Sequence, residues 1–580
     1  MKKYLLLLIA ISFLNSFSQI NKDSLISNVY FLASQELKGR MTGSPEEKKA
    51  AEFIKNKFVE FGLKPAFGES YFQTFEFTYG VEVDKKSYLE INSEKIKIGE
   101  DFSILGFSGN LEGKAEVVFA GYGIEYKKFN IDDYAGLDVA NKIVLVLRGA
   151  PKIDSSDFEY DKRAEIRSKA QLAKEKGAIG MFLINTENIS DDKLLPTRYD
   201  RSGNVENFGI VHLKTNTVEK YLPKNLDIKN LLNYHAQKEK KYLGERLFIA
   251  KIKIELNKII KNGTNVVAIL EAKNAKEFII IGAHYDHLGM GEFGSLYRGE
   301  EKLVHPGADD NASGVAMTIE LARVLSARRN ELKRTVIFAA FSGEELGLLG
   351  STYLANNFPI DLKDCAAMIN MDMIGRMNEN NDLLIYGSAT AKEWKEILKN
   401  ANEKFKFNLT LIDDGFGPSD HSSFYAKQIP VLNFFTGSHQ DYHRPTDTPE
   451  KLNYEKYALT GEYILNVVFQ ILRAETKFEY VSVPRRDQGG RMTLRTYIGI
   501  MPDFTENSIG FKIMGVSEGS PAQKAGLKGG DIIVKFGEYK IKNIYDYMSA
   551  MSKYSPGDKV KFLIQRNDNQ IELEVELAGR

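Results

Sequence analysis

The sequence is almost without cysteine and has no excess of charge of either sign. Cys365 is the only cysteine among 580 residues, which excludes a framework of disulfide bonds within the chain. Lysine plus arginine and aspartate plus glutamate both number 78, and the basic excess of a typical nucleic-acid-binding protein is therefore missing. We expect packed cores to supply the stability, no nucleic-acid partner, and Cys365 to be a small buried residue rather than a nucleophile.

Long apolar runs are also missing beyond the first residues. The opening stretch "MKKYLLLLIAISFLNSFSQ" has two lysines, an apolar run and then small residues at Ser16 and Ser18, which is the pattern of a secretory signal peptide over residues 1–18. No cysteine follows that could carry a lipid anchor, and no later segment is apolar enough to span a bilayer. The sequence thus predicts an exported protein, periplasmic or secreted, with no membrane span.

A chain of this length exceeds what one hydrophobic core usually holds. Changes in composition and in the spacing of apolar residues along the chain predict six segments. They are a signal peptide, a first part of the main domain, an inserted β-rich domain, the rest of the main domain, a linker and a C-terminal domain. The predicted boundaries are 1–18, 19–109, 110–245, 246–478, 479–496 and 497–580.

The main domain shows nearly continuous apolar strands alternating with helical segments. Examples are "FIIIGAHYDH", "GVAMTIELARVLSA", "RTVIFAAFSGEE" and "CAAMINMDMIG". Such alternation is typical of an α/β fold with a mixed, mostly parallel sheet covered by helices on both faces. The polar clusters fall where these strands end, which is where active sites of such sheets lie.

Six of the eight histidines fall in this domain together with acidic residues. The clusters are "GAHYDHLG", "HPGADDNASG", "FSGEELG", "NMDMIG", "SDHSSF" and "DYHRPTDT". Aspartate, glutamate and histidine without a suitable cysteine form a nitrogen and oxygen ligand set that suits zinc, and less often manganese or cobalt. The sequence therefore predicts a metal site at the strand ends.

Five of these segments resemble, in order, the motif set of the di-zinc M28 family of metallopeptidases, the group of aminopeptidase Y and bacterial leucyl aminopeptidase. They are His284-Tyr-Asp286, Gly307-Ala-Asp-Asp310-Asn-Ala-Ser-Gly314, Ser342-Gly-Glu344-Glu345-Leu-Gly347, Asn370-Met-Asp372-Met-Ile-Gly375 and Asp441-Tyr-His443. The resemblance covers roughly residues 23–105 and 247–473. It implies an exopeptidase that uses two zinc ions.

The resemblance also implies a role for each matched position. His284 and Asp372 would be terminal ligands of one zinc, Glu345 and His443 of the other, and Asp310 would bridge the two, with a cis peptide bond to Asn311. Asp286 would orient a ligand imidazole from behind, and Glu344 would be the general base that activates water. Asp420, His421 and Tyr442 are candidates for the substrate side. His287, His305 and His439 match no ligand position, so we expect them in loops or at the surface.

Two further resemblances concern the flanking domains. The inserted region is similar to a protease-associated (PA) domain through "VVFAGYGI", "DYAGLDVANKIVLVLRG" and "KAQLAKEKGAIGMFLIN". The C-terminal region is similar to a PDZ domain, with a carboxylate-binding loop at Tyr497, Ile498, Gly499 and Ile500. This loop would capture a peptide C-terminus or a protein partner, although such a domain can also serve only to pack on the main domain.

The leading interpretation is an exported zinc aminopeptidase acting on peptides. A carboxypeptidase or a glutaminyl cyclase is an alternative on the same scaffold, and Arg376 or Arg444 could then receive a substrate carboxylate. A non-catalytic, receptor-like binding protein is a third interpretation, and the complete set of ligand and base residues argues against it.

Overall fold

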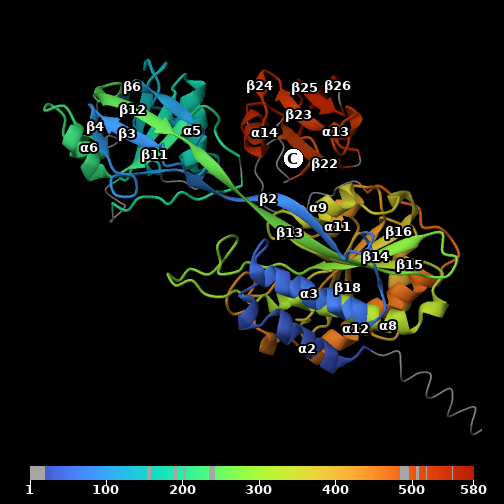
Figure 1. The fold of residues 1–580 in the computed structure, drawn as a ribbon. Helices are drawn as coiled ribbons and strands as arrows, with labels where there is room; N and C mark the ends of the chain where they lie inside the picture. Colours follow the sequence, from blue (N-terminus) through green and yellow to red (C-terminus); the bar gives the residue numbers. More distant parts are fainter. Residues whose placement is uncertain are drawn as a thin grey trace, which may run out of the picture.

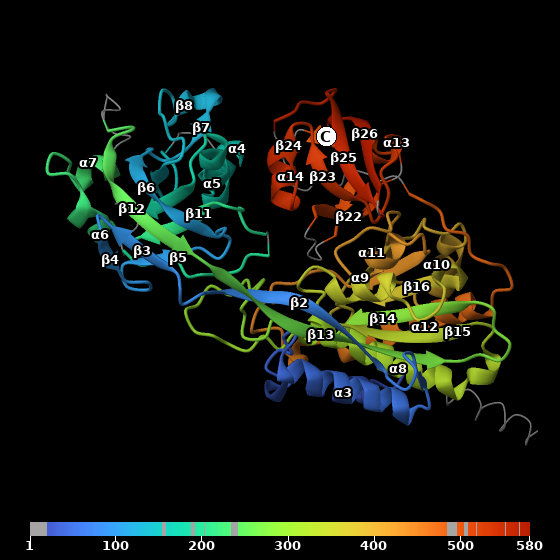
Figure 2. The same cartoon turned by 45° about the horizontal axis from the view of Figure 1, so that its top comes forward.

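The chain folds into an α/β domain, a domain inserted into it, and a C-terminal domain (Figures 1 and 2). The computed structural model describes residues 20–152, 158–186, 192–201, 203–233, 242–483, 496–503, 509–517, 519–551, 553–567 and 569–579. The predicted signal peptide and most of the predicted linker lie outside these residues. Within them, no helix is long and apolar enough to cross a membrane.

The α/β domain is built on a nine-stranded mixed sheet. The strand order is β1-β13-β15-β14-β16-β19-β17-β18, and β2 also pairs with β13. Strand β14 is parallel to β15 and β16, and β16 is parallel to β19, whereas β13 runs antiparallel to β15. The strands are β1 (Lys64–Pro65), β2 (Phe72–Val83), β13 (Leu256–Leu270), β14 (Phe278–His284), β15 (Thr335–Phe341), β16 (Cys365–Met371), β17 (Asp382–Tyr386), β18 (Asn408–Ile412) and β19 (Val431–Phe435).

Helices cover both faces of this sheet, as the apolar strands predict. One face packs against α2 (Lys22–Leu32), α3 (Pro45–Glu60), α8 (Gly314–Ala327), α10 (Trp394–Asn402) and α12 (Tyr454–Arg473). The other face packs against α9 (Leu349–Asn356) and α11 (His421–Tyr425). The short helical segments are η1 (Gln35–Leu37), η4 (Ala308–Ser313), η5 (Arg329–Glu331), η6 (Leu362–Asp364) and η7 (Pro449–Lys451).

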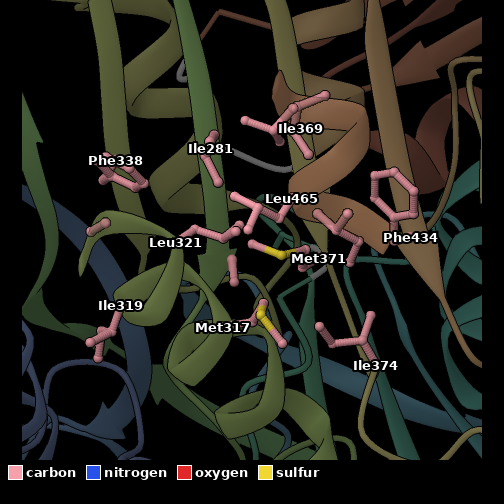
Figure 3. Packing of buried hydrophobic residues seen from close by; sticks show 14 of the residues in the cluster. Ile281, Met317, Ile319, Leu321, Phe338, Ile369, Met371, Ile374, Phe434 and Leu465 are labelled. Atoms are coloured by element: carbon pink, nitrogen blue, oxygen red, sulfur yellow. The ribbon is translucent and has the colours of Figure 1, made fainter. Parts of the chain in front are cut away.

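The central strands are apolar at every position because they are buried on both sides. In β14, Ile279 and Ile281 belong to the core under α8, whereas Phe278 and Ile280 belong to the core under α11. Figure 3 shows the first of these cores, where Ile281 lies among side chains of α8 and of strands β15, β16 and β19. The burial of Cys365 at the start of β16 confirms that this residue is part of the packing.

The inserted domain contains an eight-stranded sheet of order β4-β3-β12-β6-β9-β10-β11-β5. Its strands are β3 (Tyr88–Ile91), β4 (Glu94–Ile96), β5 (Phe102–Ile104), β6 (Leu111–Phe119), β9 (Ile143–Leu147), β10 (Gly180–Ile184), β11 (Gly209–Leu213) and β12 (Arg246–Ile254). The sheet therefore extends beyond the predicted range 110–245 at both ends. Strands outside the predicted range belong to the sheet because β12 pairs with both β3 and β6, which lie far from it along the chain.

The remaining elements of the inserted domain lie around this sheet. They are β7 (Glu125–Tyr126), η2 (Lys127–Phe129), β8 (Ile131–Asp132), α4 (Phe158–Ala164), α5 (Ile166–Glu175), α6 (Thr215–Tyr221) and α7 (Ile228–Leu232). The long strands β2 and β13 lead from the α/β domain toward the inserted domain (Figure 1).

The C-terminal domain has its own core and a sheet in which β21 occupies an edge. Its elements are β20 (Thr496–Tyr497), β21 (Ile500–Pro502), β22 (Phe511–Val516), α13 (Pro521–Lys524), β23 (Ile532–Phe536), β24 (Tyr539–Lys540), α14 (Ile544–Met551), β25 (Lys559–Arg566), β26 (Asn569–Glu576) and β27 (Ala578–Gly579). The structure places this domain beside α4 and α5 of the inserted domain (Figures 1 and 2).

Candidate metal centre

Acidic and histidine side chains converge where three neighbouring parallel strands end. His284 is the last residue of β14, Asp372 follows β16, and Glu344 and Glu345 follow β15 after a short turn. Because β14 lies between β15 and β16, these ends share one edge of the sheet. Asp310 enters from η4, and His443 comes from the loop after β19.

One half of the cluster surrounds the ring of His284. Its Nε2 lies 3.4 Å from Asp310 Oδ1 and 3.5 Å from Asp372 Oδ1. The imidazole is 1% exposed, so it is removed from solvent. The compact group of potential ligand atoms around this ring is His284, Glu344 and Asp372, and Asp310 borders it.

The other half surrounds the ring of His443. Its Nε2 lies 3.3 Å from Asp310 Oδ2 and 3.1 Å from Glu345 Oε2. Asp310 thus turns one carboxylate oxygen toward each histidine. The peptide bond from Asp310 to Asn311 is cis, as predicted.

The distances between these atoms fit a bound metal. Two ligand atoms at about 2.0–2.1 Å from one tetrahedral ion lie about 3.3 Å apart, which matches the spacing of 3.1–3.5 Å found here. Nitrogen and oxygen donors without thiolate suit zinc. Among the described residues, two groups of three side chains are close enough to hold a divalent ion: His284 with Glu344 and Asp372, and His287 with Asp310 and Glu345.

The two adjacent glutamates face different halves of the cluster. Glu345 faces His443, whereas Glu344 Oε2 lies 3.9 Å from His284 Nε2. Burial raises the pKa of Glu344 well above its usual value, and the charges of Glu345 and Asp372 add to this effect. Its surroundings therefore favour the protonated form of Glu344.

The pKa values of His443 and Glu345 shift in opposite directions, as those of an ion pair do. Burial lowers the pKa of His443, but hydrogen bonds to Asp310 and Glu345 outweigh it and raise the value to about 11. In Glu345, burial and Asp310 raise the pKa, yet the contacts with His287 and His443 bring it down to about 2. Such a cluster attracts positive charge, which a divalent cation would supply.

Asp286 lies behind the cluster and is fully buried. Its carboxylate accepts hydrogen bonds from Thr42 Oγ1 at 2.8 Å and from the backbone N–H of Glu344 at 3.2 Å. His284 Nδ1 lies 3.3 Å from the backbone carbonyl of Asp286 and 3.8 Å from its carboxylate. Asp286 therefore contacts the turn that carries Glu344 more closely than it contacts the imidazole.

The three histidines that match no ligand position lie outside the named helices and strands, in agreement with a loop position, but His287 and His305 are buried and His439 is half-buried. His287 is fully buried and its Nδ1 lies 2.6 Å from Glu345 Oε1. His305 is buried and contacts Ser295 Oγ at 2.8 Å, and His439 Nε2 lies 3.3 Å from Asp309 Oδ2. The spacing of His287, three residues after His284, was the available signal for its place in the cluster.

The candidate substrate-side residues lie in different environments. Asp420 is fully buried, and burial raises its pKa to about 7. His421 is buried near Tyr386, and burial lowers its pKa to about 3. The ring of Tyr442 stacks on His443 with centroids 3.8 Å apart, so this tyrosine packs directly on a candidate ligand.

The predicted carboxylate-binding loop of the C-terminal domain joins β20 to β21. Ile498 is buried in the core, and its carbonyl accepts the N–H of Ala522 at 2.8 Å. Gly499 has φ of +79°, a conformation that glycine adopts easily. The loop is thus anchored at the start of the edge strand β21.

Comparison with known families divides the chain in the same way. The model of peptidase family M28 matches residues 265–468, that of the PA domain matches residues 113–220, and that of the PDZ domain matches residues 496–577. These ranges correspond to the α/β, inserted and C-terminal domains. They confirm the three resemblances found in the sequence.

Similar proteins include enzymes with aminopeptidase in their names. Aminopeptidase YwaD of Bacillus subtilis is 27% identical over 367 residues, which are 61% of this chain and 67% of YwaD. A probable zinc metalloprotease of Pyrenophora teres f. teres is 41% identical over 115 residues, but these cover only 20% of this chain and 23% of that protein. An aminopeptidase structure from Aneurinibacillus sp. strain AM-1 is 26% identical, with a TM-score of 0.49 over 81% of this chain and 98% of that one. Residues 265–468 of the chain thus match peptidase family M28, and a PA domain and a PDZ domain accompany this peptidase region.

Proposed function

We propose that this protein is an exported zinc aminopeptidase that removes N-terminal residues from peptides. The observation that carries the proposal is the position of Asp310, whose two carboxylate oxygens face His284 and His443 separately. His284, Asp310 and Asp372 would hold one zinc ion, and Asp310, Glu345 and His443 the other. Export rests on the signal-peptide pattern of residues 1–18.

Bound zinc would lower the pKa of a water molecule and polarise the scissile carbonyl group. Glu344 would accept the proton of the attacking water and deliver it to the leaving amine. The raised pKa of Glu344 suits this exchange, since burial and neighbouring carboxylates favour its protonated form. Asp286, which accepts the N–H of Glu344, would hold the turn in place.

A carboxypeptidase would need a cation that is free to receive the terminal carboxylate of the substrate. Arg376 is engaged, because its Nη1 donates to Asp441 at 2.8 Å. Arg444 is next to His443, and its Nε contacts no hydrogen-bond acceptor among the described residues. The alternative to an aminopeptidase is therefore a carboxypeptidase in which Arg444 binds the terminal carboxylate of the substrate, and the test must distinguish the two.

The PDZ domain would bind the C-terminus of a peptide or protein. The backbone N–H groups of residues 497–500 would receive the carboxylate, and the peptide would add as a strand along β21. The edge position of β21 supports this proposal.

The test compares three peptides of the same sequence: one with both termini free, one with the N-terminus acetylated and one with the C-terminus amidated. We expect the purified zinc-loaded protein to release N-terminal residues from the first and third peptides only. Cleavage of the acetylated peptide at its C-terminus would show a carboxypeptidase and refute the proposal.

The matched variant is Glu344→Gln, which keeps the shape of the side chain and removes its basic group. We expect kcat to fall by about 10²–10⁴-fold, the usual contribution of a general acid–base group, with the zinc content unchanged. Wild-type turnover in this variant would show that Glu344 is not the base.

A further inference from the structure

Glu47 is a buried acidic residue in the first turn of α3. The pattern Ser44-Pro-Glu-Glu47 is that of a capping box, in which the glutamate reaches back to the start of its own helix. Ser44 caps α3 by accepting the N–H of Glu47 at 3.0 Å. In return, Glu47 Oε2 accepts the N–H of Gly43 at 2.7 Å. One carboxylate oxygen thus serves the start of the helix, and the other is left for different partners.

The second oxygen of Glu47 faces the ends of two strands of the sheet. Oε1 accepts a hydrogen bond from Ser342 Oγ, and Tyr285 Oη donates to the same oxygen at 3.1 Å. The N–H of Thr264 in β13 is a third donor, at 3.3 Å. Glu47 is 0% exposed, so these contacts form in the protein interior.

Two of these donors are neighbours of the metal centre along the chain. Tyr285 directly follows His284, the last residue of β14. Ser342 directly follows β15 and starts the turn that carries Glu344 and Glu345. Strands β14 and β15 pair with each other in the sheet. A single carboxylate oxygen therefore connects the two strand ends from which these three cluster residues project.

Side chains take over from the backbone where the two strands end. The N–H of Tyr285 still donates to the carbonyl of Phe341, at 2.8 Å. Beyond this bond, Glu47 contacts both segments through its one oxygen. Asp286 accepts the N–H of Glu344 at 3.2 Å and forms a second link. The place of the turn relative to β14 thus depends on buried acidic side chains.

The burial of this carboxylate is unfavourable unless hydrogen bonds replace the lost water. Burial raises the pKa of Glu47 to about 7, whereas the hydrogen bonds from Ser342 and Gly43 act in the opposite direction. An apolar side chain of similar size would pack α3 on the sheet without this cost. The hydrogen bonds that Glu47 accepts, rather than the packing of its helix, therefore explain a carboxylate at this position.

We infer that Glu47 is a positioning residue of the metal centre, which fixes the end of β14 and the turn after β15 relative to each other. The turn in turn determines where Glu344 and Glu345 lie beside His284. Helix α3 precedes the inserted domain in the chain, whereas both strands follow it. The contact thus joins the two separated parts of the peptidase domain at the site. The inference rests on the proposed function only where it assigns catalysis to Glu344.

The test compares Glu47→Gln, Ser342→Ala and the double variant in the full-length zinc-loaded protein. The glutamine keeps the shape of the side chain but turns an amide donor toward groups that are themselves donors. For a peptide with a free N-terminus, we expect kcat to fall at least about tenfold with KM unchanged, because a displaced base slows the reaction without weakening substrate binding. The dissociation constant of zinc should rise by about tenfold.

The double variant and a surface control separate positioning from general damage. Because Glu47 and Ser342 share one hydrogen bond, the double variant should lose no more than the larger single loss. The control is Glu52→Gln, an exposed residue of the same helix that pairs with Lys55, and it should behave as the wild type does. If Glu47→Gln does not fold, Ser342→Ala carries the same comparison, because it removes the contact and keeps the carboxylate.

Hydrogen exchange of the full-length protein in excess zinc tests the inference without any catalysis. Residues 284–288 and 342–348 should exchange at least about tenfold faster in Glu47→Gln than in the wild type, while residues 315–325 of α8 stay unchanged. A wild type that cleaves no peptide would refute the proposed function, and the exchange result would still decide the role of Glu47. Unchanged exchange at both segments, faster exchange throughout the peptidase domain, additive losses in the double variant, or an equal loss in Glu52→Gln would overturn the inference.

Discussion

His287 Nδ1 lies 2.6 Å from Glu345 Oε1, while the other oxygen of the same carboxylate lies 3.1 Å from His443 Nε2. The buried imidazole thus occupies one side of Glu345 and leaves Oε2 facing His443. We interpret His287 as the residue that sets the orientation of Glu345. Partners of this kind, behind the ligands, strongly affect how tightly a metal is held.

Replacing His287 with alanine should weaken the binding of one zinc ion by about 10–100-fold, the usual effect of losing such a partner. Zinc retained after dialysis against graded chelator concentrations would measure this. His212→Gln is the control, because His212 is equally buried but lies in the PA domain. An alanine variant with wild-type zinc retention would exclude a positioning role for His287.

The number of bound ions should follow the division of ligands between the two halves of the cluster. We expect the wild type to hold two zinc ions per chain and His443→Ala to hold about one. Asp310→Asn should weaken both ions, because Asp310 faces both histidines. Elemental analysis of the purified proteins gives the ratios, and a wild-type value of one would refute the shared role of Asp310.

Arg40 should be essential for the stability of the peptidase domain. Its fully buried guanidinium donates to the carbonyls of Leu32 at 2.9 Å, Tyr285 at 2.6 Å, Pro306 at 2.5 Å and Gly307 at 2.7 Å. Three of these carbonyls belong to the segments that precede Asp286 and Asp310.

Arg40→Met would leave four buried carbonyls without this donor, and each such group costs roughly 1–3 kcal/mol. We therefore expect the free energy of unfolding to fall by more than about 3 kcal/mol, together with loss of zinc. Thermal unfolding of the zinc-loaded protein would measure it. Arg328→Met removes an arginine paired with Glu331 at the surface and should cost less than about 1 kcal/mol; equal effects of the two variants would contradict the prediction.

The PA domain should lose stability in mild acid through His212. Burial lowers the pKa of His212 to about 4, and its Nδ1 accepts the N–H of Leu195 at 2.9 Å. Above pH about 6.5 the imidazole is neutral in both the folded and unfolded states. Between about pH 6.5 and 4 only the unfolded state takes up the proton, so the free energy of unfolding falls by about 3 kcal/mol as the pH falls.

Hydrogen exchange of β10 and β11 at pH 7.5 and 4.5, corrected for intrinsic exchange rates, would measure this loss of protection. In His212→Gln the titrating group is gone, so the difference between the two pH values should shrink. The same pH dependence in both proteins would show that His212 is not its cause.

Much of the fold was readable from local patterns. Apolar strands such as residues 278–284 predicted a sheet covered by helices, because both faces of a fully buried strand are apolar. The PA and PDZ regions were identified by their motifs. The limits of the inserted sheet were not predicted, since the pairing of β12 with β3 joins segments about 160 residues apart, and no local pattern encodes such a contact.

For the site, the sequence by itself determined which chemistry is available: acids and histidines at strand ends, two adjacent glutamates and a single buried cysteine. Only the tertiary structure decided which of these side chains lie around His284 and which lie around His443. The contact of His287 with the cluster was not apparent in the sequence, because its partner Glu345 lies 58 positions away along the chain.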